Sequence, residues 1–190
     1  MKMLRILALA SIAIPALAVS ANETYVIDPT HTFPSFEINH LGFSTFRGRF
    51  DKTEGSITLD MAKKTGKADV TIDVASVSTG VDKLNEHLLK EDFFDVAKYP
   101  TIRFTSTDFK FKGDMLLAVK GDLTMHGVTR PVKLAVASFH CGEHPLKKIQ
   151  ACGADASVTI KRSDWGISTY SPNVGEEVTL HIEIEAHKQP

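Results

Sequence analysis

The chain has 190 residues, with 22 lysines and arginines against 23 aspartates and glutamates, and 43% of its residues are hydrophobic. A net charge of −1 without any basic run argues against a protein that binds nucleic acid through the phosphate backbone. Phenylalanine is abundant, with 11 residues against three tyrosines and one tryptophan. Because its side chain carries no polar atom, this content predicts dry internal surfaces.

Residues 1–21 are expected to form a secretory signal peptide. Lys2 and Arg5 precede an apolar run of 14 residues, 6–19, which is shorter than the roughly 20 residues of a membrane-spanning helix. Small residues suit cleavage after Ala21, with cleavage after Ala18 as the alternative. The mature chain, 22–190, is then expected to be one soluble, exported domain without an integral membrane segment. Loss of the two basic residues changes its net charge from −1 to −3.

Most of the mature chain alternates apolar and polar residues, which is the pattern of β-strands with one apolar face. These segments are 24–28, 35–40, 44–53 with its second half 56–60, 68–77, 101–107, 115–123, 128–139, 154–161 and 177–187. Several exceed the usual five or six residues of a strand. Long successive strands joined by short turns favour an all-β fold, a closed antiparallel barrel of about eight strands. An immunoglobulin-like sandwich is the competing architecture.

The period becomes helical over 81–90, where Val81, Leu84, Leu88 and Leu89 form one apolar stripe. Two adjacent aromatics at 93–94 follow this helix, and an alternating strand begins at position 101. One short helix therefore lies between the fourth and fifth expected strands. We interpret the helix and the aromatic pair as a cap over one opening of the barrel.

The two cysteines, Cys141 and Cys152, lie eleven positions apart across an expected hairpin. In an exported protein this predicts a disulfide, which is worth about 3 kcal/mol in the loop-entropy model. The alternative is a metal site formed by His140, Cys141, His144 and Cys152, although this spacing matches no common zinc pattern. That alternative would make the chain a metal-binding or redox stress protein.

Eight histidines occur, and none belongs to a His-Glu-x-x-His motif. His126 falls in an expected turn, and His181 and His187 fall on the polar face of the last strand, so we expect them to be exposed or singly hydrogen-bonded. His40 shares a face with Phe36. It is expected to be either a satisfied core histidine or a group that meets the polar end of a ligand.

No nucleophile elbow, phosphate loop or dinucleotide fingerprint occurs in the sequence. The acidic pairs lie on opposite faces or on the wet face of a strand, so none predicts a catalytic dyad. We therefore expect no enzyme, no catalytic residue, no cofactor and no metal, and an isomerase or hydrolase acting inside the barrel is the remaining enzymatic alternative. The phenylalanines gather around the helix and the first strands, which favours an apolar pocket with one aromatic end.

Several segments resemble the YceI-like family, in order and over essentially the whole of 25–188. The residues that carry the resemblance are Tyr25-Val26-Ile27-Asp28 with His31, Phe36-Glu37-Ile38-Asn39-His40-Leu41-Gly42, Gly48-Arg49-Phe50 with Gly55, His87-Leu88, Asp92-Phe93-Phe94-Asp95, Tyr99-Pro100 through Phe104, Gly121-Asp122-Leu123-Thr124, His126 to Pro131, and Arg162-Ser163-Asp164-Trp165-Gly166. The cysteine pair is not common to the family and marks a subgroup.

The resemblance implies a lipocalin-like barrel in the periplasm that binds a polyisoprenoid chain, such as a quinone or a prenyl phosphate, and it supplies no catalytic residues. The residues expected around the tail of this lipid or a similar amphiphile are Phe36, Ile38, Phe43, Phe46, Leu84, Leu88, Phe93, Phe94, Phe104 and Trp165. His40 and Arg103 are expected to meet the head group. Alanine at 93 and 94 should weaken lipid retention more than a similar change at Val178 or Leu180. The sequence leaves open whether two copies pair as a homodimer.

Overall fold

A computed structural model describes residues 22–189, so the expected signal peptide lies outside the described residues. The strands are β1 Glu23–Ile27, β2 Ser35–His40, β3 Ser44–Phe50, β4 Thr53–Asp60, β5 Thr65–Asp73, β6 Val77–Ser78, β7 Thr101–Lys112, β8 Met115–Met125, β9 Val128–Glu143, β10 Gln150–Lys161 and β11 Val174–Lys188. The helices are the α-helix α1, Asp82–Leu88, and two short 3-10 helices, η1 at Val74–Ser76 and η2 at Arg162–Trp165.

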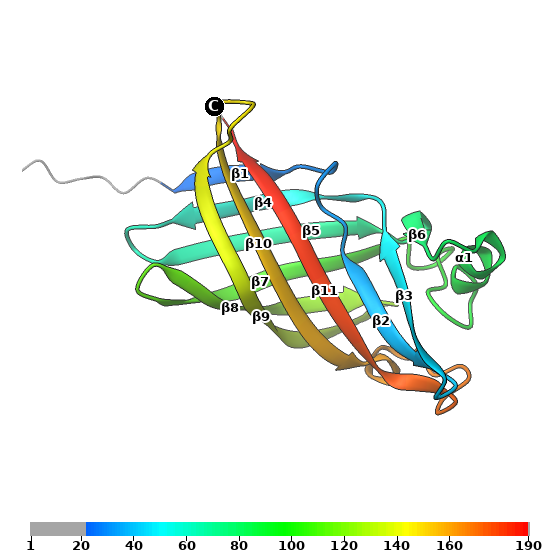
Figure 1. The fold of residues 1–190 in the computed structure, drawn as a ribbon. Coiled ribbons are helices and arrows are strands. Elements are labelled where there is room, and N and C mark those ends of the chain that lie inside the picture. Colours follow the sequence, from blue (N-terminus) through cyan, green and yellow to red (C-terminus); the bar gives the residue numbers. More distant parts are fainter. Residues whose placement is uncertain (1–21, 190) are drawn as a thin grey trace, which may run out of the picture.

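Eight of these strands close into an antiparallel barrel, which confirms the expected lipocalin-like fold (Figure 1). The order around the ring is β1, β4, β5, β7, β8, β9, β10 and β11, and the pairing of β1 with β11 closes it. Closure satisfies the backbone groups that an open sheet would leave unpaired at its edges. In this ring α1 lies on the connection between β5 and β7.

The β2–β3 hairpin extends the wall of the barrel beyond β1. The long strand β11 pairs with β1 near its carboxyl end, where Ile27 faces Ala186, and with β2 nearer its start, where Phe36 faces Leu180. The chain leaves the ladder between β1 and β2, at Pro29, which has no amide hydrogen to donate. β3 then pairs with the two-residue strand β6, so β2, β3 and β6 deepen one side of the barrel.

Strand β7 is longer than the sequence pattern indicates, because an irregularity interrupts its alternation. Its register with β8 shifts between Ser106 and Asp108, where Thr107 is an extra residue on β7, and again between Lys110 and Phe111, where the extra residue is Leu117 on β8. The extra residue in β7 changes which of its side chains face inward. The apolar period therefore ends near position 107 although the strand continues to Lys112.

Two apolar clusters fill different parts of the interior. The larger includes Phe50, Val74, Ile102 and Trp165 and packs against the α1 segment. The smaller contains Tyr25, Leu59, Cys152 and Ala186, with four further side chains from β4, β7 and β9 around it. In Figure 1 the α1 segment lies at one end of the barrel and the β4–β5 and β7–β8 turns lie at the other. Within residues 22–189, no helix has the length and apolar character needed to cross a membrane.

Candidate functional site

The barrel holds an internal cavity of about 390 Å³ with an almost entirely apolar surface. This volume lies within the range of roughly 300–1,000 Å³ that is typical of small-molecule sites. The side chains that line it are Thr32, Pro34, Ser35, Phe36, Ile38, His40, Phe46, Phe50, Thr53, Val70, Ile72, Leu84, His87, Leu88, Phe93, Phe94, Ile102, Phe104, Leu123, Met125, Val132, Leu134, Val158, Ile160, Arg162, Ile167, Tyr170, Val174, Val178, Leu180, Ile182 and Ile184.

These residues face the cavity because alternate residues of each strand point into the barrel. On β11 the inward positions are Val178, Leu180, Ile182 and Ile184, which occur at every second residue because successive side chains in a strand point to opposite faces. The same rule places alternate residues of β2, from Phe36 to His40, on the inner face. The lining is therefore a direct product of the period-2 pattern.

The aromatic rings of the lining are held by their neighbours. The ring of Phe36 lies over Gly48 of β3, where a Cβ atom would come within 2.4 Å of its Cζ. Phe36 also packs at 6.1 Å from Phe50, and Phe50 meets Phe94 edge-on at 5.7 Å. Ring centroids 4.5–7 Å apart in tilted or edge-on arrangements are favourable contacts. Gly48 is thus required by the position of the Phe36 ring.

The segment 89–100 folds back onto α1 and closes one part of the cavity. The amide of Phe94 donates to the carbonyl of Leu88 at 3.0 Å, and the amide of Tyr99 donates to the carbonyl of Asp95 at 2.8 Å. Asp95 is buried with a φ of 47°, and its carboxylate forms an ion pair with Lys98 at 2.9 Å. These bonds fix Phe94 on the inside of the segment.

An aromatic group links α1 to the β10–β11 loop at the same end. The rings of His87 and Phe93 meet edge-on at 4.9 Å, and both lie near Tyr170, at 6.2 and 6.1 Å. All three side chains line the cavity, and Tyr170 is more than half exposed. This group therefore borders the cavity on one side and solvent on the other, which defines the mouth.

A buried guanidinium lines the cavity close to the mouth. Arg162, 5% exposed, donates from Nε to the carbonyl of Gly175 at 2.8 Å, from Nη1 to Ile167 at 3.2 Å and from Nη2 to Val174 at 3.0 Å. Burial lowers the pKa of Arg162, an effect that the nearby Glu176 opposes, and an arginine remains charged at neutral pH. The terminal nitrogens each carry a second hydrogen that can meet an anionic or carbonyl oxygen.

Arg162 was not among the residues expected at the site, although a signal for it exists. Val158 and Ile160 face the cavity, and Arg162 continues that alternation by one more step. A charged residue in the inward phase of an apolar strand is an indicator of function. Arg162 lies just beyond the correctly predicted end of the strand, in η2, so alternation considered only within the strand does not include it.

Nine of the residues expected around the ligand line the cavity: Phe36, Ile38, His40, Phe46, Leu84, Leu88, Phe93, Phe94 and Phe104. Val178 and Leu180, where a change is expected to weaken lipid retention less, line it as well. They cannot serve as remote comparison positions for the aromatic pair.

Three expected residues lie outside the cavity lining. Phe43 is 89% exposed in the β2–β3 turn, where the strand alternation has ended. Arg103 occupies an outward position of β7 and forms a two-pronged ion pair with Asp69, at 3.0 and 2.6 Å. Trp165 is 2% exposed and donates its indole N–H to the carbonyl of Leu123 at 3.2 Å, so it belongs to the packed core.

The expected disulfide between Cys141 and Cys152 is present and joins facing residues of β9 and β10. Both sulfurs are therefore committed to the bridge. A metal site that relies on the two thiolates, together with His140 and His144, loses half of its ligands, because a thiolate and not a disulfide binds the metal.

Comparisons with known proteins assign the family. The YceI-like domain model matches residues 25–186. Protein YceI of Escherichia coli O6:H1 is 38% identical over 173 residues, which cover 90% of this chain and 90% of that protein. The crystal structure of Burkholderia cenocepacia BcnA has a TM-score of 0.74 at 26% identity and covers 84% of this chain and 99% of that one.

A more distant structure shares the fold. A polyisoprenoid binding domain from Saccharophagus degradans, implicated in plant cell wall breakdown, has a TM-score of 0.67 at 20% identity, covering 87% of this chain and 98% of that one. At this identity the likeness concerns the fold. The family model spans nearly the whole described region, and the Escherichia coli relative matches over 90% of its length. The chain belongs to the YceI-like family.

Proposed function

We propose that this chain is a periplasmic binding protein that holds an amphiphile with an isoprenoid or acyl tail and does not act on it chemically. Residues 1–21 would direct export, with their short positive region and apolar run. The ligand would be a quinone, a prenyl phosphate or a similar lipid. Its tail would occupy the barrel interior while its head group remains at the mouth.

The observation that carries this proposal is the cavity itself. Nearly all of its surface is apolar, and it is enclosed by the barrel wall together with α1 and the segment 89–100. An interior of this composition does not suit a polar metabolite. The metabolite would lose its hydrogen bonds to water, and the cavity offers few groups to replace them. A hydrocarbon tail makes no such demand and gains by leaving water.

Burial of the tail supplies the affinity. Each CH₂ group transferred from water contributes about 0.8 kcal/mol, so ten buried carbons contribute about 8 kcal/mol before the cost of ordering the chain is subtracted. The flat rings of Phe36, Phe93, Phe94 and Phe104 provide wide apolar faces for a branched, unsaturated tail. The polyisoprenoid-binding domain of Saccharophagus degradans, which shares this fold, supports the same class of ligand.

The mouth favours a head group that accepts hydrogen bonds. Arg162 presents a buried positive charge whose observed partners are backbone carbonyls, and His40, His87 and Tyr170 line the same end. A phosphate gains most from this arrangement, since hydrogen bonds between a guanidinium and an anion are roughly twice as strong as neutral ones. A prenyl phosphate is therefore favoured over a quinone.

The test is to purify the mature protein without detergent washing, extract its lipid and record a native mass spectrum. A bound lipid with an apolar tail is expected. The delipidated protein is then titrated with a prenyl phosphate and with a quinone of equal chain length. Saturation at 100 times Kd should add about 2.7 kcal/mol of stability, or roughly 5–10 °C in the thermal midpoint of a domain of this size.

Arg162→Met serves as the variant that tests the head-group assignment. It should reduce the affinity for the prenyl phosphate more than the affinity for the quinone, because only the phosphate is charged. The proposal is contradicted if the purified protein carries no lipid and its thermal midpoint is unchanged by both the prenyl phosphate and the quinone. Recovery of a chemically altered lipid would instead support an enzyme acting inside the barrel.

A further inference from the structure

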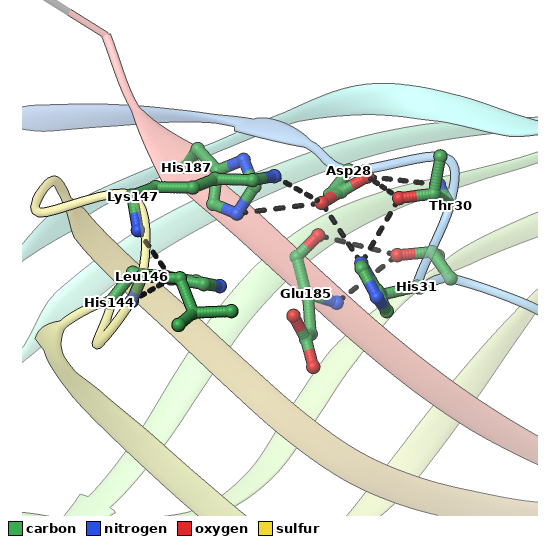
Figure 2. A network of polar contacts seen from close by, with 9 residues as sticks. Asp28, Thr30, His31, His144, Leu146, Lys147, Glu185 and His187 are labelled. Atoms are coloured by element: carbon green, nitrogen blue, oxygen red, sulfur yellow. Dashed lines mark hydrogen bonds and ion pairs between the residues drawn. The ribbon is translucent and has the colours of Figure 1, made fainter.

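A second cluster of polar side chains lies on the outside of the barrel, where β1, β11 and the β9–β10 loop meet (Figure 2). Its centre is the carboxylate of Asp28, which directly follows β1 and is 94% buried, with 6% of its side chain exposed. His31 lies three residues further along the chain. Glu185 and His187 come from β11, and Lys147 reaches in from the β9–β10 loop.

Strand geometry brings these residues together. Glu185 and His187 alternate with Ala186, which is fully buried in the interior, so both point outward. The amide of Asp28 donates to the carbonyl of Glu185 at 2.9 Å, and the amide of His31 donates to the carbonyl of Asp28 at 3.2 Å. Backbone bonds therefore hold the four potential ligands in one place.

The spacing of the side-chain atoms suits a small cation. Oδ2 of Asp28 lies 3.1 Å from Nδ1 of His31 and 3.5 Å from Nε2 of His187. A carboxylate oxygen of Glu185 lies within 4.8 Å of the ligand atoms of both Asp28 and His31. Tetrahedral zinc with bonds of 2.0–2.1 Å places its ligand atoms about 3.4 Å apart. The ligand atoms of Asp28, His31 and Glu185 already lie within 4.8 Å of one another, whereas His187 is placed only beside Asp28 and would have to turn toward the other two to complete the set.

His187 supplies an independent observation. Its Nε2 atom is enclosed by protein and, among residues 22–189, makes no hydrogen bond; its ion-pair contact is Oδ2 of Asp28 at 3.5 Å, whereas the sequence predicts an exposed or singly hydrogen-bonded histidine. A buried polar atom without a hydrogen bond costs about 1–3 kcal/mol. An imidazole nitrogen is a preferred ligand of zinc, copper and nickel, so a metal ion could take the place of the missing hydrogen-bond partner.

Polar and charged groups already surround the carboxylate of Asp28. Thr30 donates to Oδ1 from its amide at 2.9 Å and from its hydroxyl at 2.6 Å, which leaves Oδ2 to face His31, His187 and Lys147. Lys147 Nζ lies 3.1 Å from Oδ2 of Asp28 and is about half exposed on its loop. This ammonium group would compete with a metal ion and would have to move aside.

We propose that Asp28, His31, Glu185 and His187 form a binding site for a divalent zinc-type ion on the outer surface of the barrel. Two imidazole nitrogens and two carboxylate oxygens favour zinc over calcium or magnesium, which prefer oxygen ligands alone. The site differs from the His/Cys combination suggested by the sequence, since it uses neither cysteine. It is also separate from the lipid cavity, because none of its four ligands lines that cavity.

The test is isothermal titration of the untagged mature protein with Zn²⁺ at pH 7. The wild type should bind one equivalent. His31→Asn and His187→Asn, each close in size to histidine, should weaken zinc binding by at least about tenfold. The matched control is His181→Asn, which removes another outward histidine of β11 that pairs instead with Glu37 at 3.7 Å. The control should bind zinc like the wild type.

Lys147→Met distinguishes a metal site from a purely structural ion network. Removal of the competing ammonium should tighten zinc binding, whereas an ion network would lose stability and show no zinc affinity. Thermal unfolding of each variant verifies that it is folded. The proposal is overturned if neither the wild type nor Lys147→Met takes up zinc at millimolar concentration. It is equally overturned if the two histidine variants bind zinc as tightly as the control.

Discussion

The two ends of the barrel are built differently. At the end near α1, the interior is hollow and its wall is completed by the helix and by the segment 89–100. At the other end, the interior is filled by Tyr25, Leu59, Phe139 and the disulfide of Cys152, together with their neighbours. The same inward alternation operates at both ends, so the cavity wall and the filled cluster are both built from every second residue of the strands.

This difference explains how one fold combines stability with a cavity. At the filled end, a packed cluster includes a disulfide that joins β9 to β10, whereas at the hollow end the larger apolar cluster, with Phe50 and Trp165, packs around the cavity. It also predicts that a lipid enters beside α1 and that its tail ends against the filled cluster. Changes at the two ends should therefore separate stability from lipid binding.

The largest effect on stability is expected at the filled end. The double variant Cys141→Ser/Cys152→Ser should lower the free energy of unfolding by about 3 kcal/mol, because the unfolded chain loses a cross-link. Lipid affinity, measured below the unfolding transition, should remain that of the wild type, since neither cysteine lines the cavity. Denaturant unfolding and lipid titration check the two quantities. A parallel loss of affinity would show that the two ends are coupled.

The largest effect on binding is expected at the hollow end. Phe93→Ala/Phe94→Ala removes two rings from the cavity lining and from their contacts with His87 and Phe50. We expect at least a tenfold loss of lipid affinity, equivalent to about 1.4 kcal/mol or more. The lipid affinity is measured in two ways: by the amount of lipid that remains bound through purification, and by titration of the delipidated protein with lipid. If the variant retains lipid like the wild type, the two phenylalanines that follow α1 do not contribute to the binding site.

A smaller effect on stability is expected when a single buried hydroxyl group is removed. Thr53 is buried in the lining, and within the described part of the chain its Oγ1 has no hydrogen-bond partner, so Thr53→Val should raise the free energy of unfolding by about 1 kcal/mol. Thr32→Val is the matched control, because Thr32 Oγ1 donates to the carbonyl of Glu185 at 3.3 Å and accepts from its amide at 3.1 Å. The control should be destabilised. Thermal unfolding measures the stability of both variants. Equal changes in the two would contradict the inference that the hydroxyl of Thr53 is unpaired and that of Thr32 is paired.

The smallest effect is expected in the β2–β3 turn. Phe43→Ala removes a ring that is 89% exposed and lies outside the cavity lining. Lipid retention at equilibrium should therefore equal that of the wild type, which makes this variant the control for the pair at 93 and 94. A clear loss of retention would mean that Phe43 folds over the bound lipid.

The sequence pattern predicted the barrel because alternation is a local property. Each inward run, such as Val178 to Ile184 on β11, was visible in the residues alone, and so were the helical stripe of α1 and the turn at His126. The pattern failed where alternation is interrupted. The extra residue at Thr107 hid the last five residues of β7, and Arg162 faces the cavity from η2, just beyond the end of β10.

The candidate site was only partly accessible from the sequence. Rings in strand phase, such as Phe36 and Phe104, were placed correctly on the cavity wall, whereas Phe43, Arg103 and Trp165 were not. Phe43 lies in a turn and Arg103 on the outward face of its strand. A residue type alone does not indicate which of these environments it occupies.

The sequence by itself determined the strand periodicity, the helix and the family pattern, because each depends on residues close together in the chain. Only the tertiary structure decided which end of the barrel is filled, where the cavity opens and which side chains meet around Asp28. Asp28 and His187 are 159 positions apart, and they meet because closure of the barrel pairs β1 with β11. Contacts of this kind depend on the register between distant strands, which local patterns do not specify.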